Sequence, residues 1–299
     1  MATKKTASKK TARRADTAVP TRNFAPRVVT EFDILSGDPA SQPTSSDFGA
    51  RYLGEGDSWF TINAIPRSAN LLEQLPFAAP SCVLTLANPG DTIRGIAAIA
   101  CTTSLAKYLA DPRFAPTWDA ILLSGGGNDL IGAIGGIVQA GVGTSLSGYL
   151  NVVALTQVLD DVEAAYATIV ALRDRAGSPN SGGRIVTHTY DYATPRNSPA
   201  RFFGGQLSGP WLFPAFEAAG ITDVALRFAV MQRVIDALAE RLLALQARFD
   251  NFAVIDTRGL LTPSDASATG NSNDWLNEIH PNSAGYAKVA AHVVQEAGL

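Results

Sequence analysis

Ser58 is the first residue of this sequence whose surroundings suit covalent chemistry. Residues 53–60 read LGEGDSWF, so apolar residues precede the serine and a second apolar run follows it. This pattern predicts a strand end, then a turn, then a helix beginning near Phe60. Unpaired N–H groups at a helix N-terminus favour a nucleophile whose reaction creates an oxyanion. The adjacent Asp57 points elsewhere from such a turn, and we expect it to be structural.

A serine hydroxyl is a weak nucleophile and needs a base within hydrogen-bond reach. The chain has three histidines. His280 precedes Pro281 in a polar turn before a C-terminal amphipathic run, and we expect it to be the base. His188 lies within a strand pattern and is expected to be a buried structural residue. His292 falls at helical spacing and is expected to be a packed or exposed helix residue.

Two glycine-containing loops follow predicted strands between Ser58 and His280. Residues 84–91 read LTLANPGD and contain Gly90, and residues 122–129 read LLSGGGND and contain Asn128. In chain order the four motifs resemble those of the SGNH (GDSL) hydrolase family. That family has G-D-S near its N-terminus, a Gly after the second strand, G-x-N-D after the third and H-P near the C-terminus. The resemblance covers roughly Tyr52 to the C-terminus and excludes the first fifty residues.

The resemblance implies a serine hydrolase that cleaves carboxylic esters through an acyl-enzyme. Ser58 would attack and His280 would shuttle the proton. The backbone N–H groups of Ser58 and Gly90 and the side-chain amide of Asn128 would form the oxyanion hole. The implied partner is a small-molecule or lipid ester, and no cofactor or metal is implied.

The third member of the triad departs from the family pattern, which has Asp three residues before the His. That position is Asn277 here. An Asn oxygen can accept a hydrogen bond from the imidazole N–H, but it cannot stabilise an imidazolium by charge. Asn277 is therefore the matched position, Asp274 is the candidate acid, and Glu278 is a further nearby carboxylate.

Some of these motifs also occur in proteins with functions other than ester hydrolysis. A thioesterase or acyltransferase would use the same site, and the Asn at position 277 leaves open a non-catalytic protein that binds ligands in the same cleft. A nucleotide-binding loop at 125–127 is disfavoured because Leu130 stands where a third Gly is needed. An α/β-hydrolase elbow is disfavoured because Phe60 replaces the second Gly of G-x-S-x-G.

Strand and helix patterns alternate from residue 51 onward, which predicts one α/β domain over 51–299. The expected strands are 51–55, 82–87, 119–124, 184–189 and 252–256, and the expected helices are 67–75, 91–110, 150–176, 222–248 and 283–297. Such alternation predicts a three-layer α/β/α sandwich of the flavodoxin-like type with about five parallel strands. Ligands bind at the carboxyl ends of such strands, where Ser58, Gly90 and Asn128 would converge.

The N-terminal fifty residues differ in composition from the rest. Residues 1–27 hold eight Lys or Arg and one Asp, whereas the remainder holds 16 basic and 26 acidic residues. We interpret 1–27 as a disordered basic tail, either simply solvated or in contact with an anionic surface, without specific nucleic-acid binding. Residues 28–50 are interpreted as a linker that wraps onto the domain.

The sequence contains no apolar run of about 18 residues that would predict a membrane span. It also shows no secretory signal, so we expect a cytoplasmic location. Residues 130–148 are uncharged and rich in Gly and Ala, and we interpret them as a mobile flap or a membrane-touching segment. The aromatic, Gly/Pro-rich segment 201–216 is expected to form either a binding wall or a satellite hydrophobic cluster. Cys82 and Cys101 have no metal-site spacing.

Overall fold

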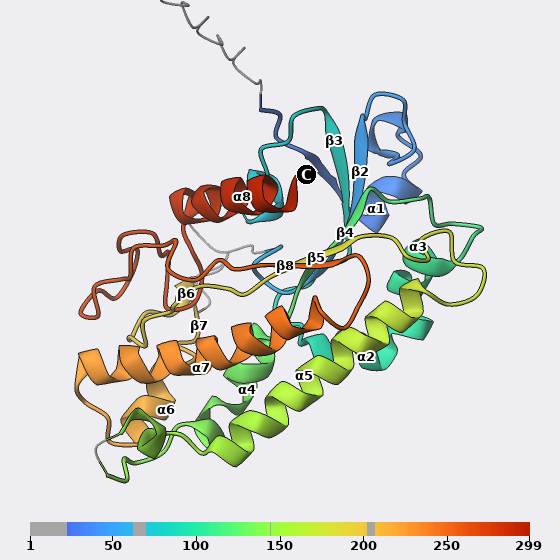
Figure 1. Ribbon diagram of the computed structural model, residues 1–299. Helices are drawn as coiled ribbons and strands as arrows, with labels where there is room; N and C mark the ends of the chain where they lie inside the picture. The colour runs from blue at the N-terminus through green and yellow to red at the C-terminus, as the bar shows by residue number, and fades with distance from the viewer. Residues whose placement is uncertain (1–22, 62–69, 144, 202–206) are drawn as a thin grey trace, which may run out of the picture.

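A six-stranded parallel sheet forms the centre of the molecule, in the order β1-β3-β2-β4-β5-β8. The computed structural model describes residues 23–61, 70–143, 145–201 and 207–299 (Figure 1). The strands are β1 (Arg27–Val29), β2 (Ala50–Gly56), β3 (Ser81–Thr85), β4 (Ala120–Ser124), β5 (Ile185–His188) and β8 (Phe252–Ile255). The predicted α/β fold with a parallel sheet is confirmed, and all five expected strands are present.

The sixth strand, β1, begins at Arg27, the last residue of the segment expected to be a disordered tail, and continues into the segment expected to be a linker. Phe24, also in the expected tail, exchanges two backbone hydrogen bonds with Phe77, so residues 23–27 are ordered against the domain. Arg27 pairs with Cys82 and Val29 with Leu84, so β1 extends the sheet beyond β3. A three-residue strand is too short to show alternation, and only the exposed edge of β3 makes it a strand. Residues 1–22 of the basic tail lie outside the described residues, and its contact with an anionic surface stays a prediction.

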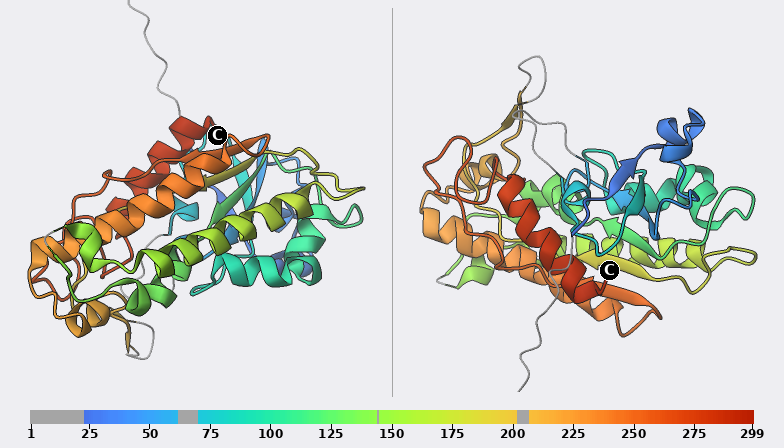
Figure 2. Two further views of the ribbon diagram at one scale, coloured as in Figure 1. Left: turned by 60° about the horizontal axis from the view of Figure 1, so that its bottom comes forward. Right: turned by 90° about the horizontal axis from the view of Figure 1, so that it is seen from above.

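Helices cover both faces of the sheet, as parallel strands require. Figure 1 shows α8 on one side of the sheet and α2, α5 and α7 on the other, and Figure 2 shows α8 crossing its face diagonally. The helices of the core layers are α2 (Ile93–Ile99), α3 (Ser104–Ala110), α4 (Gly127–Ile137), α5 (Val152–Arg173), α7 (Val224–Leu245) and α8 (Ser283–Ala297). A further short helix, α1 (Glu31–Leu35), follows β1.

Two helix expectations need correction. The expected helix 91–110 is divided into α2 and α3 by a 3-10 turn at Ala100–Thr102. Of the expected helix 67–75, residues 67–69 lie outside the described residues, and the rest contains a 3-10 helix at Leu72–Gln74. Within the described residues, no helix is long and apolar enough to cross a membrane.

The segment 130–148 is not a flap in its first half. It begins inside α4, whose residues Leu130, Ile134 and Ile137 are buried in the core. These residues follow helical spacing, which gives one apolar face that packs inward although the segment is rich in glycine. Val138 then pairs with Leu150 across an isolated bridge.

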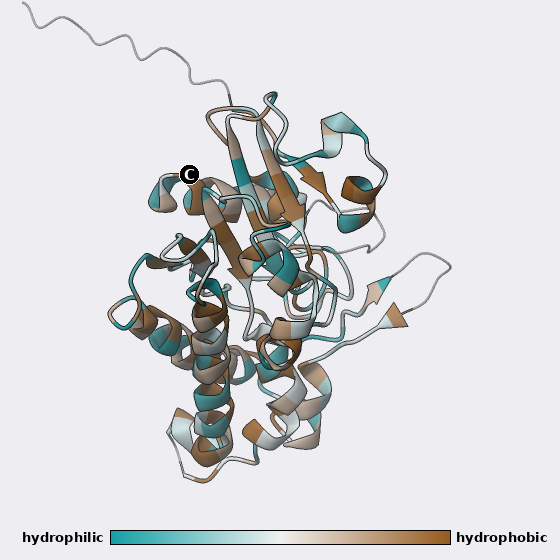
Figure 3. Cartoon of the chain, turned by 90° about the vertical axis from the view of Figure 1, so that its right-hand side faces the viewer, coloured by the Kyte–Doolittle hydropathy of each residue, from teal (hydrophilic) through white to brown (hydrophobic). Residues whose placement is uncertain are grey.

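The aromatic segment 201–216 joins the core at its C-terminal part. A short hairpin of β6 (Ala200–Arg201) and β7 (Leu207–Ser208) projects from the body, and α6 (Phe213–Ala218) follows it (Figure 3). Leu212 and Phe216 are buried in the main hydrophobic core, so this part of the segment does not form the satellite cluster that was one of the two expectations. Residues 202–206 lie outside the described residues.

Candidate active site

Ser58 lies on a single helical turn directly after β2. The N–H groups of Phe60 and Thr61 both donate to the backbone oxygen of Asp57, which closes that turn. The Ser58 side chain is 7% exposed and faces His280. The expected strand-to-turn placement is therefore confirmed, while the helix expected to continue from Phe60 falls mostly on residues outside the described ranges.

His280 connects Ser58 to Asn277. Its Nε2 atom lies 2.7 Å from Ser58 Oγ, and its Nδ1 atom lies 3.0 Å from Asn277 Oδ1. Asn277 Oδ1 also accepts the backbone N–H groups of Ile279 and His280, which fixes it as an acceptor. Nδ1 of His280 must then carry the proton, leaving Nε2 free to accept from Ser58.

Burial lowers the pKa of His280 to about 3. No carboxylate among the described residues accepts a hydrogen bond from its ring. The imidazole is therefore neutral at pH 7, which is the protonation state that a general base requires.

Asp274, the candidate acid, does not contact His280. Its Oδ2 atom accepts from the backbone N–H of Thr262 and from Lys288 Nζ. The carboxylate six residues before the histidine is thus directed toward α8, while Asn277, three residues before it, reaches the ring. Of the two candidates, the structure brings only Asn277 to His280.

Glu278 does not contact the His280 ring and instead binds backbone N–H groups of two other segments. Its carboxyl accepts backbone N–H groups from Arg196, Trp211, Leu212 and Phe213. It thereby ties the segment before α6 to the histidine loop and places Trp211 edge-on against the His280 ring, at 5.4 Å between ring centres. Burial raises the pKa of Glu278 to about 7.

Asp57 is structural, as expected, and joins β2 to β4 and β5. It accepts hydrogen bonds from Ser124 Oγ at 2.8 Å and from the Tyr190 hydroxyl at 2.6 Å. His188 is buried and lies 3.0 Å from Ser124 Oγ, so it completes this network instead of serving as a base. Burial raises the pKa of Asp57 to about 6 and lowers that of His188 to about 3.

Trp59 links the serine turn to the histidine loop and was not identified from the sequence. Its indole Nε1 donates to the Ile279 backbone oxygen at 3.2 Å. Its ring stacks on His188 and meets Trp275 and Tyr286 edge-on. An aromatic residue next to a nucleophile has no distinctive spacing, so only the tertiary contact reveals this role.

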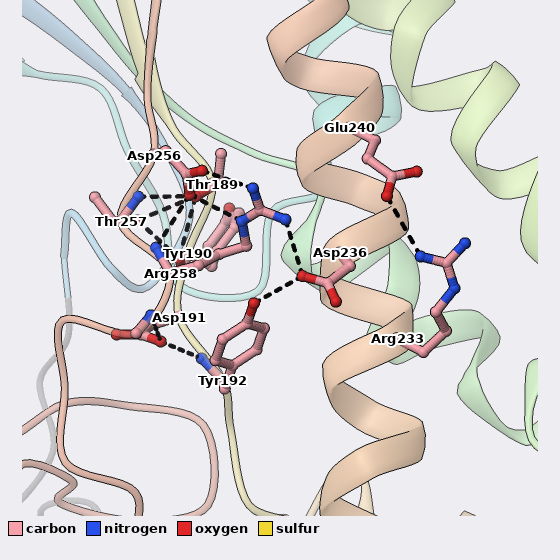
Figure 4. Close-up of polar contacts among 11 residues, drawn as sticks. Thr189, Tyr190, Asp191, Tyr192, Arg233, Asp236, Glu240, Asp256, Thr257 and Arg258 are labelled. Carbon is pink, nitrogen blue, oxygen red and sulfur yellow. Dashed lines mark hydrogen bonds and ion pairs between the residues drawn. The ribbon is translucent and has the colours of Figure 1, made fainter. Parts of the chain in front are cut away.

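A polar network holds the loops after β5 and β8 to helix α7 (Figure 4). Arg258 pairs with Asp256 in its own loop and with Asp236 on α7, which also accepts from the Tyr192 hydroxyl. Asp191 accepts the backbone N–H groups of Gly259 and Leu261. The network fixes the segment that carries Tyr190 toward Asp57.

A pocket of about 250 Å³ brings the four sequence motifs together. Ser58, Gly90, Asn128 and His280 all line it, and Trp211 forms part of its wall. The backbone N–H groups of Ser58 and Gly90 donate to no acceptor within the described residues. Asn128 donates one amide hydrogen to the Asp91 backbone oxygen at 2.9 Å, which orients the amide and leaves its second hydrogen available.

A smaller cavity of about 40 Å³ adjoins Ser58 on the side of α4 and α7. Asp57, Ser58, Asn128, Tyr190 and Asp191 contribute to its lining, and the aliphatic part comes from Leu130, Ile131, Ala193, Leu212, Met231, Ile235 and Ile279. Among the residues that the structure describes, no cluster of three His, Cys, Asp or Glu side chains is arranged to hold a metal ion.

The sequence model of the GDSL-like Lipase/Acylhydrolase family matches residues 56–288, which include Ser58, Gly90, Asn128 and His280. The chain therefore belongs to this family, and it is a carboxylic ester hydrolase. A comparison with curated proteins finds no match.

Solved structures of similar fold include several esterases and lipases. The lipase Lip_vut3 from a goat rumen metagenome has a TM-score of 0.50 at 16% identity, over 83% of this chain and 97% of its own. An extracellular lipase from Streptomyces rimosus has a TM-score of 0.47 at 12% identity, over 83% of this chain and 100% of its own. The M. smegmatis aryl esterase has a TM-score of 0.44 at 13% identity, over 84% and 99%. At these identities the likeness concerns the fold alone.

Proposed function

We propose that the protein hydrolyses short-chain carboxylic esters through an acyl-enzyme on Ser58. The observation that carries the proposal is the unbroken contact from Ser58 Oγ through His280 to Asn277 Oδ1, at 2.7 and 3.0 Å. A buried neutral histidine in contact with a serine hydroxyl is the arrangement that activates the serine.

In the first half of the reaction, Ser58 Oγ attacks the ester carbonyl carbon while its proton passes to His280 Nε2. The carbonyl oxygen becomes an oxyanion, which the N–H groups of Ser58 and Gly90 and the Asn128 amide stabilise. The bond to the alcohol oxygen then breaks, and His280 returns the proton to that oxygen. In the second half, His280 Nε2 takes a proton from a water molecule as this water attacks the acyl carbonyl carbon. The bond to Ser58 Oγ then breaks, the carboxylic acid leaves, and His280 returns the proton to Ser58 Oγ.

Asn277 orients the imidazole through a hydrogen bond but brings no negative charge next to it. The imidazolium formed during the reaction is then stabilised by one neutral hydrogen-bond acceptor where the family pattern has a carboxylate.

The apolar cavity beside Ser58 sets the size of the acyl group. A single water occupies about 10–15 Å³ of such a cavity. The cavity has a volume of about 40 Å³, so it holds only a few heavy atoms. We therefore propose acetyl and propionyl esters as the substrates, with activity that falls as the acyl chain lengthens.

Labelling with a fluorophosphonate tests the nucleophile. Intact-mass analysis should show one adduct on the wild-type protein and none on Ser58→Ala. Esters of 4-nitrophenol from acetate to octanoate then test the cavity. Labelling that persists in Ser58→Ala would refute the assignment, and a preference for octanoate would refute the proposed acyl size.

A further inference from the structure

A second and larger groove adjoins the nucleophile pocket. It has a volume of about 780 Å³ and lies between α1, α2 and the loop that follows β3. Gly90 lines both this groove and the pocket that contains Ser58 and His280. The groove and the nucleophile pocket therefore meet at Gly90, next to the expected position of the ester carbonyl.

Glu55, from β2, provides a buried carboxyl to this groove. It is only 6% exposed, although it lines a large opening. Its Oε1 atom accepts the backbone N–H of Gly56 at 2.9 Å, and the described residues supply no further partner. Asp91 lines the same groove, and its side chain receives one long contact of 3.4 Å from Asn88.

Within the described residues, neither carboxyl has a positively charged partner. Among the described residues, no Lys, Arg or His lines the groove. Two described cations near the groove have other partners. Lys107 pairs with Glu31, which also lines the groove, and Arg94 pairs with Asp129 and Asp161. Burial raises the pKa of Glu55 to about 8 because a negative charge there lacks solvation, and Asp91 adds to the effect.

We propose that this groove binds the cationic alcohol portion of an ester, the ammonium group of an amino alcohol, with Glu55, which releases its proton when the cation binds, as its counter-charge. A cation in the groove supplies a compensating charge that the described residues of the groove do not supply. Apolar residues at the groove wall, among them Ile96, Ile99 and Leu105, suit the methyl or methylene groups around such a nitrogen. This proposal rests on the function proposed for Ser58.

A pair of esters that differ in charge but not in shape tests the groove. Acetylcholine and 3,3-dimethylbutyl acetate share the acetyl group, and a neutral carbon replaces the quaternary nitrogen in the second. Wild type should favour acetylcholine in kcat/KM by about tenfold or more, since close charge pairs couple at least this strongly. Glu55→Gln should lose most of this preference, measured as the ratio of the two kcat/KM values.

Glu296→Gln is the matched control. Glu296 is exposed on α8, away from the groove, and its substitution changes the net charge by the same amount. It should keep the wild-type preference. If wild type treats both esters alike, or if the preference survives Glu55→Gln, the cation proposal is overturned. A preference for glycerol monoacetate that depends on Glu55 would also overturn it, in favour of a neutral hydroxyl ligand.

Calorimetric binding of choline to Ser58→Ala separates this proposal from the proposed function. Binding should weaken by about tenfold when Glu55→Gln is added to Ser58→Ala. Choline binding that depends on Glu55, together with no fluorophosphonate adduct on wild type, would support the groove and refute the catalytic role of Ser58. Hydrolysis of the neutral ester by wild type, together with no choline binding to Ser58→Ala, would support the catalytic role of Ser58 and refute the cation site in the groove.

Discussion

At the scale of single residues, Asn277 is the most informative departure from the family pattern. Its Oδ1 atom accepts three hydrogen bonds, including the one from His280, so the orientation of the ring is fully determined. Its Nδ2 atom is buried and finds no partner among the described residues. An amide at this position thus keeps the geometry of a triad and omits its negative charge.

Asn277→Asp should therefore raise activity. The carboxylate would stabilise the imidazolium and would remove the unpartnered amide hydrogens, so we expect kcat/KM to rise about tenfold. In the dependence of kcat/KM on pH, the midpoint of the acid limb should lie at a higher pH in this variant than in wild type, where the His280 pKa of about 3 sets it. Hydrolysis of 4-nitrophenyl acetate between pH 4 and 9 measures both effects.

Asn277→Ala is the companion variant and should be less active than wild type, since the ring loses its acceptor. An Asn277→Asp protein with unchanged rate and unchanged acid limb would show that the charge of the third residue does not limit this enzyme.

At the scale of elements, the serine turn depends on close contact between β2 and β4. Gly56, the last residue of β2, has φ of +153°, and a Cβ added to it would lie 2.3 Å from the Ser124 backbone oxygen. Asp57, directly after it, donates its backbone N–H to that same oxygen. Only glycine lets the two strand ends approach closely enough to place Ser58 beside His280.

Gly56→Ala should accordingly destabilise the fold by more than about 2 kcal/mol and abolish ester hydrolysis, because backbone must move to admit the methyl group. Chemical denaturation and a fluorophosphonate labelling rate measure the two effects. Gly136→Ala in α4 is the control, since nothing lies within 4 Å of the added Cβ. It should stabilise the protein by about 0.5 kcal/mol. Equal stability of the two variants would contradict the argument.

At the scale of the whole molecule, the active-site end of the sheet holds several buried carboxyls with raised pKa. Burial raises the pKa of Glu55 to about 8 and that of Glu278 to about 7. Each folded-state pKa lies above that of an unfolded glutamate. Between those values the folded protein holds a proton that the unfolded chain has released, so each group loses its stabilising effect as pH rises through the folded pKa.

Stability should therefore fall as pH rises from 6.5 to 8. The buried His188 and His280 act in the opposite direction, since their lowered pKa values of about 3 cost stability only below the unfolded histidine value of about 6.5. Urea unfolding at pH 6.5, 7.2 and 8.0 measures the slope. Glu55→Gln should flatten it, and a wild-type stability that rises over this interval would contradict the assignment.

The sequence by itself determined the α/β class, five of the six strands and the residues that meet at the active site. Local signals sufficed because strands of a parallel sheet share one carboxyl end, so the loops carrying Ser58, Gly90 and Asn128 had to converge. The His-Pro motif supplied the base because few histidines compete with it.

Only the tertiary structure decided which side chain completes the site around His280. Asp274, Asn277 and Glu278 lie within five residues of one another, and their sequence spacing does not say which way each points. Lys288 on α8 holds Asp274, the backbone N–H groups of the segment before α6 hold Glu278, and Asn277 is left to face the ring. Partners from distant parts of the chain thus determine the direction of the Asp274 and Glu278 side chains. The sequence does not show these partners, because a hydrogen bond depends on position in space and not on separation along the chain.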